Sequence, residues 1–193
     1  MNRGQAGSQI TTLRVEEVWS TTTSLRSGSC AQSTLTATVP EDLLIRILEV
    51  VGHLPSAGHT QPQEFIVIKN QNTKDRLAEA ALGQQQVTEA PLVIAVISDT
   101  RRSKKRYSER GERFYSIVDG AFASMLLMLV CTDQGLGCSF VGAFDDDAVR
   151  GVLGLPAAVR PIGIIAIGYC AEKAQKLERL PRNRVIHYET WKE

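Results

Sequence analysis

One stretch of the chain constrains the fold more than any other: residues 121–131 are apolar around almost the whole circumference of a helix. This stretch lies within residues 113–134, which read as one long helix, and a helix of this kind needs cover on every side. It is much shorter than the roughly 20 apolar residues that a membrane-spanning helix requires. A small domain provides limited cover, and obligate interfaces resemble a domain core cut in half. We therefore predict an obligate dimer, in which the polar tail ending near Tyr188 and Trp191 reaches across the partner.

The rest of the chain mixes helices and strands in an irregular order. Strands are predicted at residues 65–68, 92–97, 138–141 and 162–169, and the second is apolar on both faces, which indicates a central strand. Helices are predicted at residues 13–19, 73–82 and 145–152, and after Pro40, where Glu41 and Asp42 suit the first turn. These elements predict an α+β domain with helices packed on a sheet. We expect residues 1–12 to form a flexible arm and residues 13–193 to form one domain.

Charge and the placement of cysteines and histidines exclude several classes of function. Lys and Arg total 22 against 21 Asp and Glu, whereas proteins held to nucleic acid through phosphates usually carry a clear basic excess. The four cysteines and three histidines show no zinc-ligand spacing, so no metal site is predicted. No signal peptide is recognisable. We expect a cytoplasmic protein with reduced thiols and with neither nucleic acid nor membrane as a partner.

Two local motifs admit more than one interpretation. Residues 101–106 hold five basic residues in six, which is typical of a solvated loop after a central strand. The alternatives are a patch that attracts a phosphorylated partner, such as the 2′-phosphate of NADPH, and, less favoured, a nucleic-acid contact. Gly135 and Gly137 follow a helix and precede a strand, with Phe140 where the dinucleotide-binding fingerprint needs glycine. They indicate a helix end rather than a Rossmann site.

The loop before the strand at residues 65–68 carries the most specific pattern. It reads Pro55-Ser56-Ala57-Gly58-His59-Thr60-Gln61-Pro62, followed by Phe65-Ile66-Val67. This resembles the PSxxNxQPxxF(I/V)V signature of the nitroreductase family of flavoproteins. Further pieces follow in the family's order: Glu89-Ala90-Pro91, Asp119-Gly120-Ala121, Gly135-Leu136-Gly137, Val141-Gly142-Ala143-Phe144, Leu153-Gly154-Leu155-Pro156, Gly168-Tyr169, Arg179-Leu180-Pro181 and His187-Tyr188-Glu189-Thr190-Trp191. The resemblance covers about residues 13–193.

The resemblance implies a three-layer α+β sandwich, a mixed sheet flanked by helices, that forms a homodimer with one FMN at each end of the interface. It also implies an oxidoreductase that takes a hydride from NADH or NADPH onto flavin N5 and passes reducing equivalents to a nitroaromatic, quinone or similar small acceptor. Because the flavin carries the chemistry, no catalytic side chain is required. The alternative is a flavin-binding sensor or carrier without significant turnover, which departures from the family's motifs keep open.

By the same resemblance, the FMN phosphate is held by Ser24, Arg26 and Arg179. The family's RRSxR motif corresponds here to Thr22-Thr23-Ser24-Leu25-Arg26, so the leading arginine pair has become threonine. The letters Arg101-Arg102-Ser103-Lys104-Lys105 resemble that motif but follow the second strand. We interpret them as unrelated to the phosphate site.

The resemblance also assigns the contacts to the flavin ring. They are, in the loop, Pro55, Ser56, Ala57, His59 and Gln61 and, beyond it, Gln86, Gly142 and Ala143. His59 replaces the family's asparagine, and imidazole lacks the paired donor and acceptor of a carboxamide. Gln86 rests on a looser alignment than the others.

Overall fold

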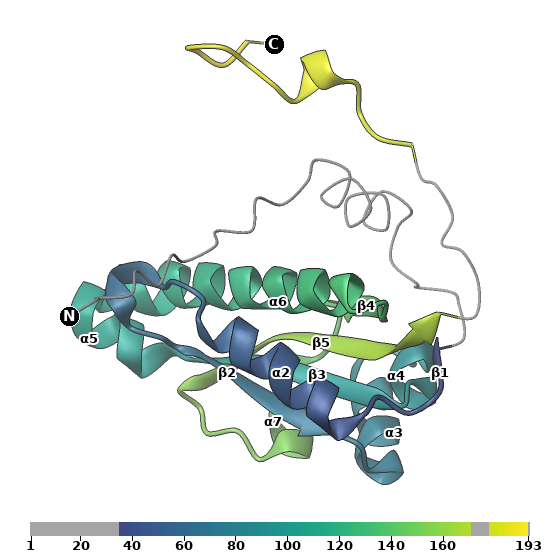
Figure 1. Ribbon diagram of the computed structural model, residues 1–193. Coiled ribbons are helices and arrows are strands. Elements are labelled where there is room, and N and C mark those ends of the chain that lie inside the picture. Colours follow the sequence, from purple (N-terminus) through teal and green to yellow (C-terminus); the bar gives the residue numbers. More distant parts are fainter. Residues whose placement is uncertain (1–34, 171–177, 193) are drawn as a thin grey trace, which may run out of the picture.

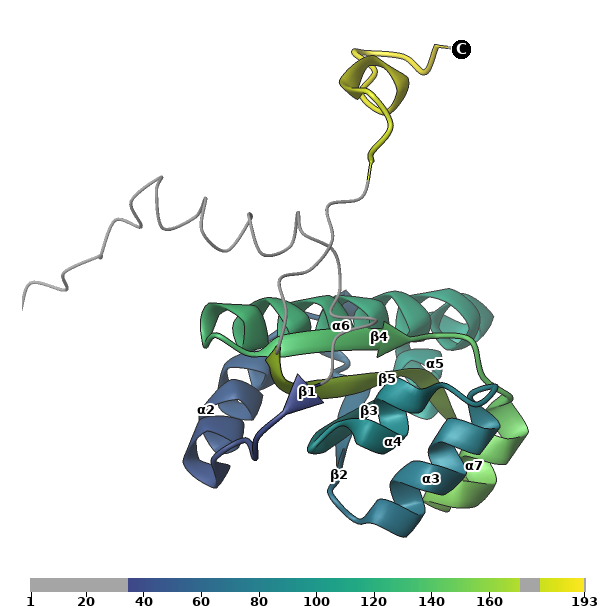
Figure 2. The same ribbon diagram turned by 90° about the vertical axis from the view of Figure 1, so that its right-hand side faces the viewer.

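The computed structural model describes residues 35–170 and 178–192. The predicted arm over residues 1–12, the predicted helix over residues 13–19, and Ser24 and Arg26 lie outside the described residues. Between residues 35 and 170 the chain forms a sheet with helices on both faces (Figures 1 and 2), which confirms the α+β class.

Four strands form the sheet in the order β4-β5-β3-β2, and a two-residue strand, β1, pairs with the end of β5. The strands are β1 (Leu35–Thr36), β2 (Gln63–Ile68), β3 (Leu92–Asp99), β4 (Gly137–Val141) and β5 (Val159–Cys170). Every residue of β3 is buried, and β3 lies between β5 and β2, which confirms the predicted central strand. All strand pairs among the described residues are antiparallel, so the expected mixed sheet is wrong for this part of the chain.

Successive side chains of the central strands point to opposite faces of the sheet, and each face has its own apolar core. Val93 and Ala95 belong to a core with α3, α4 and α7, whereas Ile94 and Val96 belong to a core with α2 and α6. The helices are α2 (Glu41–Gly52), α3 (Gln71–Ala80), α4 (Gln85–Glu89), α6 (Ser116–Asp133) and α7 (Asp146–Leu153). The result is three layers, helices on sheet on helices, and α4 is the one helix of these five that the sequence pattern did not predict.

The basic run is helical, which corrects the expectation of a solvated loop. It forms α5 (Thr100–Arg110), and a π-helical stretch, η2 (Gly111–Tyr115), joins α5 to α6. Tyr107 and Ser108 break the helix, and Ser108 has a φ of 50°. The chain turns back at this break, and residues 100–106 pack closely against η2. A Cβ on Gly111 would overlap the carbonyl oxygen of Ser103.

Within the described part of one chain, the apolar helix predicted from residues 121–131 is buried on one side and exposed on the other. Ala123, Leu127 and Cys131 are fully buried against the sheet. On the outer side, Phe122 is 56% exposed and Met125 is 46% exposed. By length and composition alone, an apolar window within the helical stretch Thr100–Asp133 could cross a membrane. The break at Ser108 and the packing of α6 on the sheet indicate instead a helix of a folded domain with one exposed face.

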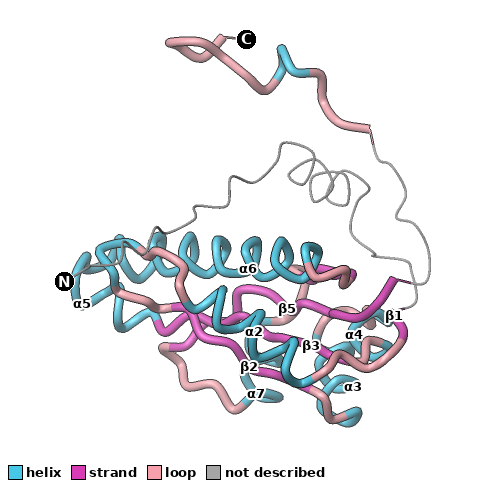
Figure 3. The backbone as a smooth tube through the Cα atoms, in the orientation of Figure 1, coloured by secondary structure: helices cyan, strands magenta, loops and turns pink. Residues whose placement is uncertain are grey.

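The C-terminal segment that the structure describes stands away from the sheet. Figures 1 and 3 show residues 178–192 as mostly loop with one short helical turn, η3 (Arg182–Arg184), apart from the helices and strands. Tyr188 and Trp191 in this segment are exposed.

Among the cysteines, Cys131 and Cys138 are free and buried, while Cys170 is disulfide-bonded, so the expectation of reduced thiols fails for Cys170.

Candidate functional site

The signature loop leaves α2 and enters β2 through a short 3₁₀ turn, η1 (Ala57–His59). Gly58, His59 and Gln61 all have positive φ, at 55°, 58° and 46°. Two side chains of the loop hold this unusual backbone. The Oγ of Ser56 accepts a hydrogen bond from the Gln61 amide at 2.8 Å, and the Thr60 hydroxyl donates to the Ala57 carbonyl at 3.0 Å.

A buried carboxylate on α6 fixes the loop from the protein interior. Asp119 is only 3% exposed, and its Oδ1 and Oδ2 accept from the Ala57 amide at 3.1 and 3.2 Å. Burial raises the pKa of Asp119, and the hydrogen bond from Ala57 lowers it in part. No role for Asp119 was predicted from the sequence, although an acidic side chain inside an apolar helix is itself a signal of a specific polar partner.

The loop lies at the end of the sheet where three strand ends meet. The Asp99 amide, at the end of β3, donates to the Pro62 carbonyl at 2.8 Å. Thr100 donates from its amide to the Ala158 carbonyl at 3.0 Å, just before β5 begins. The first turn of α5 therefore starts beside the signature loop.

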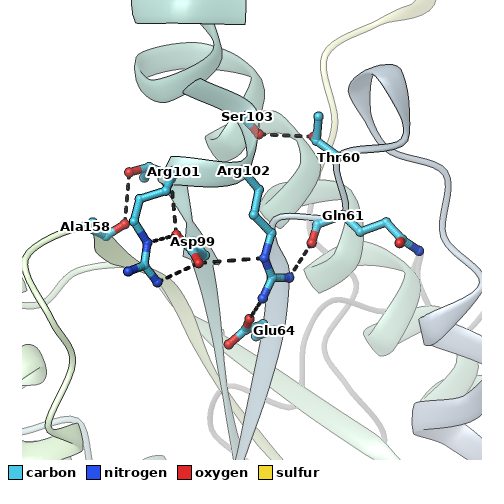
Figure 4. Close-up of polar contacts among 9 residues, drawn as sticks. Thr60, Gln61, Glu64, Asp99, Arg101, Arg102, Ser103 and Ala158 are labelled. Atoms are coloured by element: carbon cyan, nitrogen blue, oxygen red, sulfur yellow. Dashed lines mark hydrogen bonds and ion pairs between the residues drawn. The ribbon is translucent and has the colours of Figure 1, made fainter. Parts of the chain in front are cut away.

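Asp99 organises the start of the basic helix (Figure 4). Its carboxylate accepts from the Arg101 amide and, at 2.8 Å for each oxygen, from the Arg101 guanidinium. These hydrogen bonds hold the pKa of Asp99 below its usual value. Arg102 approaches the same carboxylate at 3.7 Å, pairs with Glu64, and donates to the Gln61 carbonyl at 2.7 Å. Two of the run's arginines are thus fixed in place, one of them onto the signature loop.

Farther along α5, three more side chains contact the loop. The hydroxyls of Ser103 and Thr60 lie 3.2 Å apart and form a hydrogen bond (Figure 4). A Cβ built on Gly58 would overlap the Arg106 side chain and the Tyr107 hydroxyl, so this position requires glycine both for its φ and for the close approach of α5. The basic run is therefore part of the surroundings of the signature loop.

The other predicted contacts lie elsewhere in the chain. Gln86 lies on α4, before the start of β3, while the signature loop adjoins the end of that strand, roughly 23 Å away along eight residues. Gly142 and Ala143 are exposed and follow β4, on the far side of β5 from the loop. Arg179 lies in the separate C-terminal segment. One chain therefore does not bring these predicted residues together.

Among the described residues, no cluster of His, Cys, Asp and Glu could hold a metal ion. The donor set at the loop consists of backbone amides and carbonyls, small hydroxyls and one imidazole. Such a set suits an organic ligand with a polar edge rather than a cation.

The sequence and the fold are similar to those of known proteins. A model of the nitroreductase family matches residues 25–93 and 83–169. An NADH dehydrogenase of Thermus thermophilus is 34% identical over 175 residues, covering 77% of this chain and 85% of that protein. An FMN reductase [NAD(P)H] of Bacillus subtilis is 28% identical over 167 residues, covering 79% of this chain and 67% of that protein. The solved structure of nitroreductase A from Vibrio parahaemolyticus superposes with a TM-score of 0.80 at 19% identity, covering 90% of this chain and 77% of that one, which supports the fold. The chain belongs to the nitroreductase family, whose NAD(P)H nitroreductases and FMN reductases are oxidoreductases.

Proposed function

We propose that this nitroreductase-family oxidoreductase binds FMN and passes reducing equivalents from NAD(P)H to a nitroaromatic, quinone or similar small acceptor. The conformation of the signature loop carries the proposal. Its positive-φ residues are fixed from one side by Asp119 and from the other by α5. A loop held in this way presents its polar groups before any ligand arrives, which lowers the entropic cost of binding.

The described residues fit the chemistry of FMN. The loop carries small side chains and the imidazole of His59, which suit a planar ring with a polar edge. Directly after the loop, the buried Oε1 of Gln63 has no hydrogen-bond partner among the described residues, and buried acceptors of this kind normally have one. Arg179 has no acidic partner among the described residues and donates only to the Glu178 carbonyl, at 3.3 Å. Its guanidinium is free to pair with a phosphate.

A homodimer would unite the separated halves of the site. In one chain the signature loop lies apart from Gln86 and, separately, from Gly142 and Ala143. A second copy would supply each loop with the missing contacts. The exposed outer side of α6 offers a surface for that copy, because Phe122 and Met125 lie exposed there. The apolar side chains of residues 178–192 are also exposed, and we propose that this segment packs on the partner.

When bound, FMN supplies the redox chemistry by accepting a hydride at N5 and releasing reducing equivalents to the second substrate. The chain's own residues bind and orient. The loop residues Pro55, Ser56, Ala57 and Gln61 would border the ring, and His59 would donate a hydrogen bond to a ring oxygen or nitrogen. Asp119 is too deeply buried to reach a substrate and acts by holding the Ala57 amide. We propose no catalytic side chain, and a cytoplasmic location stays a prediction.

The phosphate site provides a direct test. We propose that Ser24, Arg26 and Arg179 hold the FMN phosphate. Removing one partner of a desolvated charge pair costs about 2–5 kcal/mol, roughly 30-fold to several thousand-fold in affinity. Arg26→Ala and Arg179→Ala should therefore purify largely without flavin and yet bind riboflavin, which lacks the phosphate, as well as wild type does. Arg184→Ala, an exposed arginine of the same C-terminal segment, is the control and should keep FMN.

Steady-state oxidation of NAD(P)H separates the enzyme from the alternative, a flavin-binding sensor or carrier. The enzyme oxidises NAD(P)H continuously when a quinone or nitroaromatic is present. A sensor or carrier would bind flavin with the same arginines but show a single reduction and no sustained turnover.

A further inference from the structure

The cations of α5 and η2 fall into two groups. Arg101 and Arg102 pair with Asp99 and Glu64, Lys104 pairs with Glu112 at 2.8 Å, and Arg113 pairs with Glu109 at 2.9 Å. The other three, Lys105, Arg106 and Arg110, are exposed and have no carboxylate partner in the part of the chain that the structure describes.

Aromatic rings position two of these unpaired cations without neutralising them. The Arg106 guanidinium lies 5.7 Å from the centre of the Tyr107 ring. Arg110 lies 5.0 Å from the Phe114 ring and 5.3 Å from the Tyr115 ring, and its Nε donates to the Tyr115 hydroxyl at 3.1 Å. Stacking of this kind orders a guanidinium while leaving donors of its planar fork free for a bidentate anion.

The aromatic rings also connect the two arginines with each other. Tyr107 and Tyr115 contact edge to face with their centres 4.9 Å apart. Because the Arg106 side chain lies against Gly58, this cation group begins at the signature loop and extends away from it along η2. A ligand that reaches from the loop onto α5 therefore meets positive charge, although the whole chain has a net charge of only +1.

We propose that Arg106 and Arg110, assisted by Lys105, bind the 2′-phosphate of the nicotinamide dinucleotide, so that the protein uses NADPH in preference to NADH. This inference rests on the proposed function, because it assumes that the nicotinamide ring reacts at the flavin beside the signature loop. The ribose phosphate of the same molecule is a dianion separated from that ring by the length of the dinucleotide. The cation group starts where Arg106 contacts Gly58 and continues to Arg110, which lies against the rings of Phe114 and Tyr115. Two guanidiniums held on connected aromatic rings match a dianionic phosphate in charge, and each can donate two parallel hydrogen bonds to its oxygens.

The test compares donors and variants. Arg106→Gln and Arg110→Gln each remove one charge, and Arg113→Gln removes the same charge from the same segment at an arginine that already has a partner. Loss of a hydrogen bond to a charged group lowers affinity about tenfold or more. We expect kcat/KM for NADPH to fall by about this factor in Arg106→Gln and Arg110→Gln, while kcat/KM for NADH and the thermal midpoint stay near wild type. Arg113→Gln should leave both donors unaffected.

A binding measurement keeps this inference separate from turnover. Calorimetry with adenosine 2′,5′-bisphosphate should show binding to wild type that weakens about tenfold in Arg106→Gln, with adenosine 5′-monophosphate as the control ligand. Equal loss with NADH and NADPH would overturn the inference, as would a loss of FMN affinity beyond about threefold, because the cations would then serve the pyrophosphate or the flavin phosphate. If wild type binds the bisphosphate but takes up no flavin, the proposed function fails while the phosphate site stands.

Discussion

The close packing of α5 on η2 can be tested with one methyl group. Gly111 has helical φ and ψ of −61° and −47°, and at such a position alanine normally stabilises a helix by about 0.5–1 kcal/mol. Here the added Cβ would overlap the Ser103 carbonyl oxygen, lie 2.6 Å from the Ser103 carbonyl carbon, and lie 2.9 Å from the Cβ of Tyr107. Two of these three contacts are with backbone, so α5 itself must move. We therefore expect Gly111→Ala to destabilise the protein.

The expected size follows from overpacking, which typically costs about 1–3 kcal/mol. At roughly 2–4 °C per kcal/mol for a chain of this length, the thermal midpoint should fall by about 4–8 °C for a net cost near 2 kcal/mol. Gly151 is the control, because it lies inside α7 and a Cβ there would meet nothing within 4 Å. Gly151→Ala should raise the midpoint by about 1–4 °C.

Thermal unfolding followed by circular dichroism measures both variants, and trypsin adds a local readout. If α5 is displaced in Gly111→Ala, its basic run should be cleaved faster than in wild type or in Gly151→Ala. A Gly111→Ala protein that melts at or above the wild-type midpoint would refute the packing of α5 on η2 described here.

Three further predictions follow from single contacts. Because burial raises the folded-state pKa of Asp119, the ionised side chain costs stability, so the unfolding free energy should fall as pH rises from about 4 through that raised pKa; denaturation of wild type and Asp119→Asn over this range should give curves that differ in slope, and parallel curves would contradict the burial. Phe122→Glu combined with Met125→Glu should convert the proposed dimer into a monomer by light scattering, and a dimer that survives both charges would place the interface elsewhere. If His59 touches the flavin ring, the midpoint potential of His59→Asn should vary with pH differently from wild type near pH 6–7, and superimposable curves would remove His59 from the ring contacts.

Local sequence patterns predicted those helices and strands whose own residues indicate their type and burial. The all-apolar run of β3 indicated a central strand, and the start of α2 after Pro40, with acids in its first turn, was recognisable from capping rules. The helical state of α5 was not recognisable, because its residues are polar on nearly every side. It is stabilised by partners distant in sequence, such as the Gln61 carbonyl that Arg102 binds.

In the candidate site, too, local pattern was predictable and contacts between residues distant in sequence were not. The signature loop was recognised from its residue pattern. The positive φ angles of Gly58, His59 and Gln61 show that it forms a specific turn. The support of the loop by Asp119 depends on two residues 62 positions apart, which no local pattern connects. Gly142 and Ala143 are separated from the loop by the strand order, and Gln86 is separated from it by the length of β3. Neither is visible in local sequence, so the residues were predicted as one site although one chain does not assemble it.

An anaerobic titration of the protein, purified without added flavin, tests the central claim most directly. The absorbance spectrum should show bound flavin, and the cofactor released on denaturation should be FMN rather than FAD or riboflavin. Stepwise addition of NADPH should bleach the flavin bands with an endpoint of one donor per FMN, and admission of a quinone should restore them. A colourless protein that takes up no FMN on reconstitution, or a flavin that NADPH and NADH both fail to reduce, would contradict the account.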